Sequence, residues 1–151
     1  MELQQRSYSC GPAALRAALY VLGHINIQEK TLRTLASTTP EDGTNEEGMR
    51  VAAEHYNVKV KELHTASIRE ARQWLRKNLA KERPVILCGS NWSHWVAAVG
   101  VLGKKVLVFD PARGKNRRKK YSGLRLYTED ELATYWCCQG EEFPYYALVL
   151  F

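Results

Sequence analysis

The hydrophobic period of this chain changes near its middle, and that change constrains the fold more than any other feature. In the first half, apolar residues recur every three to four positions, as they do on one face of a helix. In the second half, short apolar runs bounded by Gly, Pro and Asp indicate strands. The predicted helices span 12–22, 28–37, 45–56, 68–79 and 128–137, and the predicted strands span 58–63, 84–88, 94–101, 105–110 and 145–151. Helices followed by antiparallel strands predict an α+β fold, not alternating βαβ units.

The length of 151 residues, with 45% hydrophobic and 25% charged residues, predicts a single domain over 1–151 with its own core. The sequence has no apolar run near the roughly 18 residues needed to cross a bilayer. The polar stretch Gln4-Gln5-Arg6 interrupts any signal peptide. If Met1 is the natural start, we expect a cytoplasmic protein.

The four cysteines are spaced in a way that matches no zinc motif, so we expect neither a metal nor an organic cofactor. A reduced compartment is the simpler interpretation of unpaired thiols. Cys88 lies in an apolar run and is expected to be an inert core residue, and packing is favoured for Cys137-Cys138 over a redox or metal pair.

The formal net charge of +6 is concentrated in Arg113–Lys120, where six basic residues lie within eight positions. One interpretation is a solvated loop, and the other is a contact with an acidic partner. Aromatic residues do not interleave with this run, which argues against a nucleic-acid partner.

Cys10 lies at the start of the first predicted helix. Pro12 suits a first helical turn, and Gly23 suits the end of that helix. Unpaired N–H groups and the helix dipole favour a negative charge at this position, which lowers the pKa of a thiol and makes it nucleophilic. Cys10 is therefore either a packing residue or a nucleophile.

A cysteine nucleophile needs a base and a group that orients the base. His94 begins one predicted strand and Asp110 ends the next, with Gly103-Lys104 as the turn between them. In an antiparallel pair, the start of one strand lies beside the end of the other. We therefore predict that Cys10, His94 and Asp110 form a catalytic triad.

Four further side chains are candidates for the site. Gln4 and Gln5 lie six and five residues before Cys10, and either amide could donate a hydrogen bond to an oxyanion. Trp92 and Trp95 flank His94 and are candidates for contacting the substrate, although packing is the commoner role for such residues. His24, His55 and His64 lie far from these motifs in the sequence and are expected to be surface or partly buried residues.

The sequence resembles a known family over roughly residues 3 to 138. The residues that carry the resemblance are the segments Gln4–Leu15, Asp42–Met49, Pro84–Leu87, Ser93–Val99, Val106–Ala112 and Thr128–Leu132, with Trp136. In this order and spacing they are similar to the bacteriocin-processing cysteine peptidases, which remove double-glycine-type leader peptides, and to their stand-alone relatives.

The resemblance implies a papain-like α+β fold, with N-terminal helices packed on a C-terminal antiparallel sheet. It implies a cysteine peptidase in which Cys10 is the nucleophile, His94 the base and Asp110 its orienting partner. It favours Gln4 over Gln5 as the oxyanion-hole donor, together with the N–H of Cys10. The expected substrate is a peptide or small protein. The alternatives are acyl transfer on the same scaffold and a non-catalytic peptide-binding module.

Overall fold

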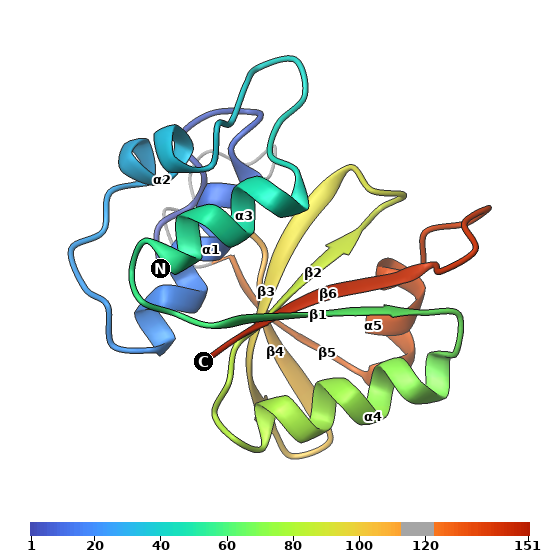
Figure 1. Cartoon of the computed structure of the whole chain (residues 1–151). Coiled ribbons are helices and arrows are strands. Elements are labelled where there is room, and N and C mark those ends of the chain that lie inside the picture. Colours follow the sequence, from blue (N-terminus) through green and yellow to red (C-terminus); the bar gives the residue numbers. More distant parts are fainter. Residues whose placement is uncertain (113–122) are drawn as a thin grey trace.

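The computed structural model describes residues 1–112 and 123–151, and its centre is one antiparallel sheet with helices on both faces (Figure 1). The helices are α1 (Cys10–Val21), α2 (Glu29–Leu35), α3 (Glu46–Glu54), α4 (Ile68–Leu79) and α5 (Glu129–Trp136). The strands are β1 (Val60–Thr65), β2 (Val85–Gly89), β3 (His94–Leu102), β4 (Lys105–Phe109), β5 (Leu124–Tyr127) and β6 (Tyr145–Leu150).

The strand order is β1-β6-β2-β3-β4-β5, and every neighbouring pair is antiparallel. The C-terminal strand β6 is inserted between β1 and β2, so it joins the two halves of the chain in one sheet. β3 and β4 form a hairpin in which Leu102 pairs with Lys105 across the turn. This hairpin brings the start of β3 and the end of β4 to the same edge.

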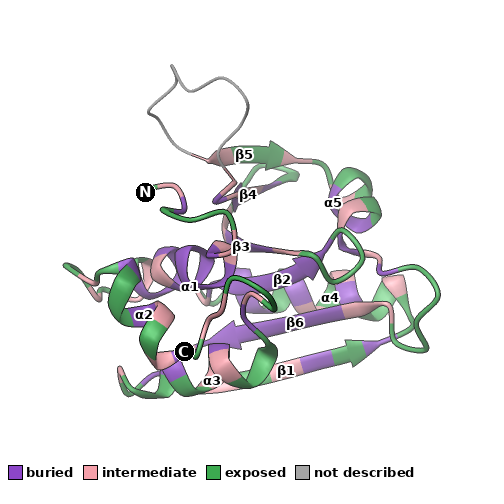
Figure 2. Ribbon diagram, turned by 90° about the horizontal axis from the view of Figure 1, so that it is seen from above, coloured by how far each residue is buried: buried purple, intermediate pink, exposed green. Residues whose placement is uncertain are grey.

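The sheet separates two hydrophobic clusters. α1, α2 and α3 pack on one face, where Ile86 and Cys88 of β2 point toward them. α4 and α5 pack on the other face, toward which Val85 and Leu87 point. β2 is buried on both faces (Figure 2), which explains why its sequence is a continuous apolar run and does not alternate.

The α+β class predicted from the change of hydrophobic period is confirmed. The prediction packed the N-terminal helices on the sheet without assigning a face, and the structure places α4 on the opposite face from α1–α3. Strand β5 was not predicted, because four residues are too few for alternation to be distinguished from chance.

Two further sequence-based expectations concern the basic run and membrane-spanning segments. The basic run Arg113–Lys120, predicted to be a solvated loop or a contact with an acidic partner, lies outside the described residues. Among the residues that the structure does describe, none of the helices has both the length and the apolar character needed to span a bilayer.

Candidate active site

Cys10 is the first residue of α1, and the sequence explains why that helix is held so firmly. Every residue from Gly11 to Leu15 is buried, and α1 packs against the sheet through these small and apolar side chains. A Cβ at Gly11 would lie 2.8 Å from Cβ of Thr44, so glycine permits the close approach of the neighbouring loop. The start of the helix, and with it the thiol, is thus fixed by packing on several sides.

His94 and Asp110 are brought together by the β3–β4 hairpin, although sixteen residues separate them. His94 is the first residue of β3, and Asp110 directly follows β4. Nε2 of His94 lies 2.7 Å from Oδ1 of Asp110, which also accepts a 2.9 Å hydrogen bond from the N–H of Ala112. Because Nε2 is engaged by the carboxylate, Nδ1 is the ring nitrogen left for the hydrogen bond with Cys10.

The electrostatics of the three side chains favour a thiolate at Cys10. Burial alone would raise the pKa of this thiol, but the hydrogen bond and positive charge of His94 outweigh burial. The backbone N–H groups of Trp95 and Gly11 add to this effect, and the pKa falls below its ordinary value of 9.0. A thiolate near neutral pH is the reactive form of cysteine.

The same interactions hold His94 in its charged form. Burial alone would lower the pKa of the imidazole, but its hydrogen bonds with Asp110 and Cys10 raise the pKa from 6.5 to about 9. For Asp110, burial raises the pKa and the hydrogen bond with His94 lowers it, and the net result is a lowered pKa. These pKa shifts all favour a thiolate at Cys10, an imidazolium at His94 and a carboxylate at Asp110.

Gln4 and Gln5 differ sharply in burial. The Gln4 side chain is buried, and its backbone N–H donates to the carbonyl of Pro111 at 3.0 Å, next to Asp110. Its amide nitrogen donates to the carbonyls of Arg6 (2.8 Å) and Ser7 (3.1 Å). Gln5 is exposed. Of the two glutamines, Gln4 is the buried one, and its backbone contacts the residue that follows Asp110.

The two tryptophans that flank His94 also have different environments. Trp95 is only 5% exposed, and its Nε1–H donates to the carbonyl of Thr44 at 2.8 Å, so it is a core residue. Trp92 is 39% exposed, with its ring 5.4 Å from that of Tyr146. It lies in a turn in which Ser90, Asn91 and Trp92 all have left-handed backbone conformations. Of the two tryptophans, Trp92 is therefore the exposed one.

Two residues near the site were missed by sequence reasoning. The hydroxyl of Tyr135 donates to the carbonyl of His94 at 3.3 Å and thus connects α5 to the start of β3. Glu29 is fully buried and accepts hydrogen bonds from the segment before Cys10. In the sequence, Glu29 looks like an ordinary acidic residue in a first helical turn, and no sequence signal distinguishes it.

The other titratable residues of interest lie outside this arrangement. All four cysteines are free, and burial raises the pKa of the Cys88 thiol, as expected for an inert core residue. His24 and His55 contact Tyr56, and His64 contacts Tyr146. Within residues 1–112 and 123–151, no cluster of three or more His, Cys, Asp or Glu side chains could hold a metal ion.

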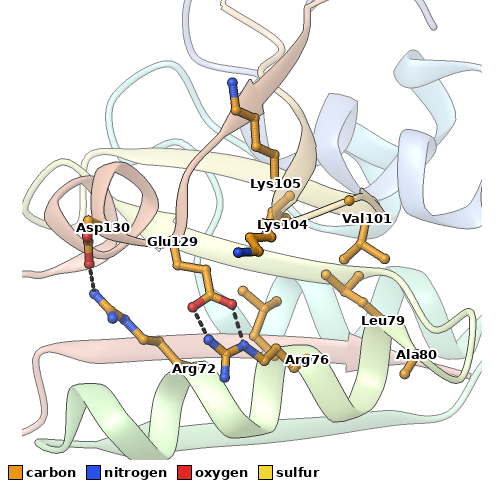
Figure 3. Close-up of a pocket in the computed structure, with 12 residues that line it drawn as sticks. Arg72, Arg76, Leu79, Ala80, Val101, Lys104, Lys105, Glu129 and Asp130 are labelled. Carbon is orange, nitrogen blue, oxygen red and sulfur yellow. Dashed lines mark hydrogen bonds and ion pairs between the residues drawn. The ribbon is translucent and has the colours of Figure 1, made fainter.

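A hollow of about 630 Å³ lies at the opposite end of the β3–β4 hairpin from His94 (Figure 3). Apolar residues such as Leu79 and Val101 line it. Its two arginines already have partners on α5, since Arg72 binds Asp130 at 2.5 Å and Arg76 binds Glu129. The hollow is therefore separate from the candidate active site, and its ion pairs connect α4 with α5.

The chain is similar to known proteins over most of its length. The model of the Peptidase C39 family matches residues 1–134. An uncharacterized protein of Methanothermobacter thermautotrophicus is 34% identical over 130 residues, which cover 86% of this chain and 84% of that protein.

Two solved structures share the fold. The peptidase domain of Streptococcus ComA, a bifunctional ABC transporter involved in quorum sensing, has a TM-score of 0.70 at 18% identity, covering 99% of this chain and 95% of the other. A double-glycine motif protease from an AMS/PCAT transporter, in complex with its leader peptide, has a TM-score of 0.67 at 22% identity, covering 98% and 87%.

Proposed function

Since this chain belongs to the Peptidase C39 family, we propose that it is a cysteine peptidase whose triad is Cys10, His94 and Asp110. The observation that carries this proposal is the position of the His94 ring, which hydrogen-bonds to the Asp110 carboxylate at 2.7 Å and to the Cys10 thiol. This arrangement lowers the pKa of the thiol and supplies a proton donor beside it. A nucleophile, a base and an orienting group are the requirements of covalent catalysis.

The proposed reaction has two stages. The Cys10 thiolate attacks the scissile carbonyl carbon, and the resulting oxyanion accepts a hydrogen bond from the Cys10 N–H, which has no acceptor within α1. The His94 imidazolium donates its proton to the leaving amine, and the acyl-enzyme forms. His94 then takes a proton from water, which attacks the acyl carbon and releases the acid and the thiolate. Asp110 holds the ring orientation throughout.

Gln4 is the proposed second donor to the oxyanion. Both hydrogens of its amide nitrogen point to carbonyls of Arg6 and Ser7 in the substrate-free protein. For catalysis, one of these hydrogens has to turn toward the substrate, and the hydrogen bond from the Gln4 backbone N–H to the Pro111 carbonyl holds this segment next to Asp110.

Replacement of the two glutamines should separate their roles. We expect Gln4→Ala to lower kcat by about 10²-fold, because an oxyanion-hole donor acts mainly in the transition state. Gln5→Ala should stay within about twofold of the wild type, because its side chain is exposed. Steady-state peptide hydrolysis measures both effects. Equal losses in the two variants would contradict the assignment of Gln4.

We propose that the substrate is a peptide with a pair of glycines before the scissile bond. The supporting observations are the family membership and the likeness to a double-glycine motif protease that was crystallised with its leader peptide. The exposed ring of Trp92, two residues from His94, is the proposed contact for a neighbouring substrate side chain.

This proposal can be tested with two synthetic peptides that differ only at the glycine pair. The wild-type chain should cut the Gly-Gly peptide after the second glycine, as read by mass spectrometry of the products. The Ala-Ala peptide should be cut at least about tenfold more slowly, because added methyl groups must fit beside the thiol. Equal cleavage of both peptides would contradict the substrate class, and cleavage of neither would contradict peptidase activity on this class.

A further inference from the structure

Glu29 is a buried carboxylate that the proposed reaction does not use. It is the first residue of α2 and has no solvent exposure. Its oxygens accept hydrogen bonds from the backbone N–H of Gln5 at 3.0 and 3.2 Å and from the hydroxyl of Ser9 at 2.7 Å. Gln5 lies 24 residues and Ser9 lies 20 residues before Glu29 in the chain. Glu29 thus binds a distant loop and not the amides of its own helix.

The surroundings compensate the buried charge. The guanidinium of Arg16 on α1 lies 4.0 Å from the carboxylate, and that of Arg33 on α2 lies 3.8 Å away. Both arginines are mostly buried. A buried carboxylate persists only when it is paired and hydrogen-bonded. The Glu29 carboxylate therefore has two positive neighbours and accepts hydrogen bonds from Gln5 and Ser9. Together these contacts connect the N-terminal segment with α1 and α2.

The loop held by Glu29 carries both proposed oxyanion donors. Gln5 follows Gln4, and Ser9 precedes Cys10, so each donor lies one residue from an anchored position. The Ser9 oxygen also accepts the N–H of Arg6 at 3.0 Å. The carbonyl of Arg6 in turn accepts a hydrogen bond from the Gln4 amide. The carboxylate is thus connected to Gln4 and Cys10 by short chains of hydrogen bonds.

We propose that Glu29 is the positioning residue of the oxyanion hole, and that it sets the separation between the Gln4 amide and the Cys10 N–H. This proposal rests on the proposed function. Glu29 does not touch the substrate, because it is fully buried. Its effect is on geometry, to which oxyanion stabilisation is sensitive, since a misplacement of about 1 Å costs on the order of 10² in rate.

The variant Glu29→Gln tests this proposal in the full-length chain. Glutamine keeps the size of the side chain but replaces one accepting oxygen by an NH₂ group, which places a donor against either the Gln5 N–H or the Ser9 hydroxyl. We expect kcat for the Gly-Gly peptide to fall about 10- to 100-fold, with KM within about twofold. A fall in kcat at constant KM is the mark of an interaction made in the transition state.

A second measurement separates positioning from general loss of structure. Iodoacetamide reacts with a thiolate by displacement at a saturated carbon, so it needs the Cys10–His94 pair but no oxyanion hole. Its rate of alkylation at Cys10 should stay within about twofold of wild type in Glu29→Gln. Parallel losses of alkylation and hydrolysis, a rise in KM alone, or unchanged hydrolysis would each overturn the proposal.

Two further variants complete the design. Glu129→Gln removes a carboxylate that pairs with Arg76 far from the site and should leave both rates unchanged. Ser9→Ala removes one contact of Glu29 and should show the same selective loss of kcat. If Glu29→Gln does not fold, Ser9→Ala tests the proposal in its place. If iodoacetamide alkylates Cys10 of the wild-type chain but the chain hydrolyses no peptide, the proposed function itself is contradicted. That outcome is observed with the wild-type chain alone and needs no Glu29 variant.

Discussion

Replacing Cys10 with alanine should abolish peptide cleavage while leaving the chain folded. Without the sulfur there is no covalent intermediate, and loss of a nucleophile in such a unit costs on the order of 10⁵-fold or more in kcat. The fold should persist because Cys10 is only partly buried and alanine is a strong helix former at the start of α1. Product analysis of the Gly-Gly peptide by mass spectrometry measures the loss, and circular dichroism checks the fold.

The chain offers its own control for this variant. Cys137 is also free and partly exposed, but it lies just after α5, and its thiol contacts the Tyr145 hydroxyl of β6. Cys137→Ala should therefore cleave the peptide at the wild-type rate. Substantial cleavage by Cys10→Ala would show that another group is the nucleophile, and the triad would have to be abandoned.

Replacing His94 with alanine should have the second-largest effect, because this residue acts twice. It holds the thiol as a thiolate, and it transfers protons to the leaving amine and from water. We expect hydrolysis to fall on the order of 10⁴-fold. The exposed His55 serves as the matched control, and the His55→Ala variant should hydrolyse the peptide at the wild-type rate.

Alkylation of Cys10 measures the first of these two roles separately. In His94→Ala the hydrogen bond and the positive charge of His94 are lost, while burial and the backbone N–H groups of Trp95 and Gly11 remain, so the pKa of the Cys10 thiol should rise above its wild-type value. The thiolate fraction at pH 7 drops, in part offset by higher intrinsic nucleophilicity, so alkylation by iodoacetamide should slow by about tenfold. An unchanged rate would mean that His94 does not control the thiol.

The pH dependence of wild-type hydrolysis follows from the same two groups. On the acid side, activity requires the thiolate, whose pKa is lowered, so the rise in rate should lie below pH 9.0. On the alkaline side, activity requires the protonated imidazole, whose pKa is raised to about 9, so the rate should fall as the pH rises through that value. A rate that rises steadily through pH 9 would contradict the ion pair.

Much of the fold followed from local pattern. The helical period of α1 and α3, the turn at Gly103, and the capping of α5 by Thr128 depend on residues close together in sequence, and the structure has these elements within a few residues of the predicted bounds. The pairing of His94 with Asp110 was predictable for the same reason, because a tight hairpin with a short turn fixes which strand ends meet.

Other aspects depended on contacts that no local pattern encodes. Gln4 and Gln5 are adjacent and chemically identical, and only packing of the N-terminal segment beside Pro111 buries one and exposes the other. Trp92 and Trp95 differ because Trp95 enters the core against Thr44. α4 lies on the far face because the sheet has two apolar faces to cover, and the helical period of a sequence does not say which face it covers.

The sequence by itself determined the class of the fold, the position of Cys10 at the head of a helix, and the hairpin that joins His94 to Asp110, because each depends on short-range periodicity or a tight turn. Only the tertiary structure decided which glutamine is buried and which tryptophan is exposed, and that a carboxylate on α2 holds the loop before Cys10. The physical reason is that burial and buried hydrogen bonds arise between segments 20 or more residues apart.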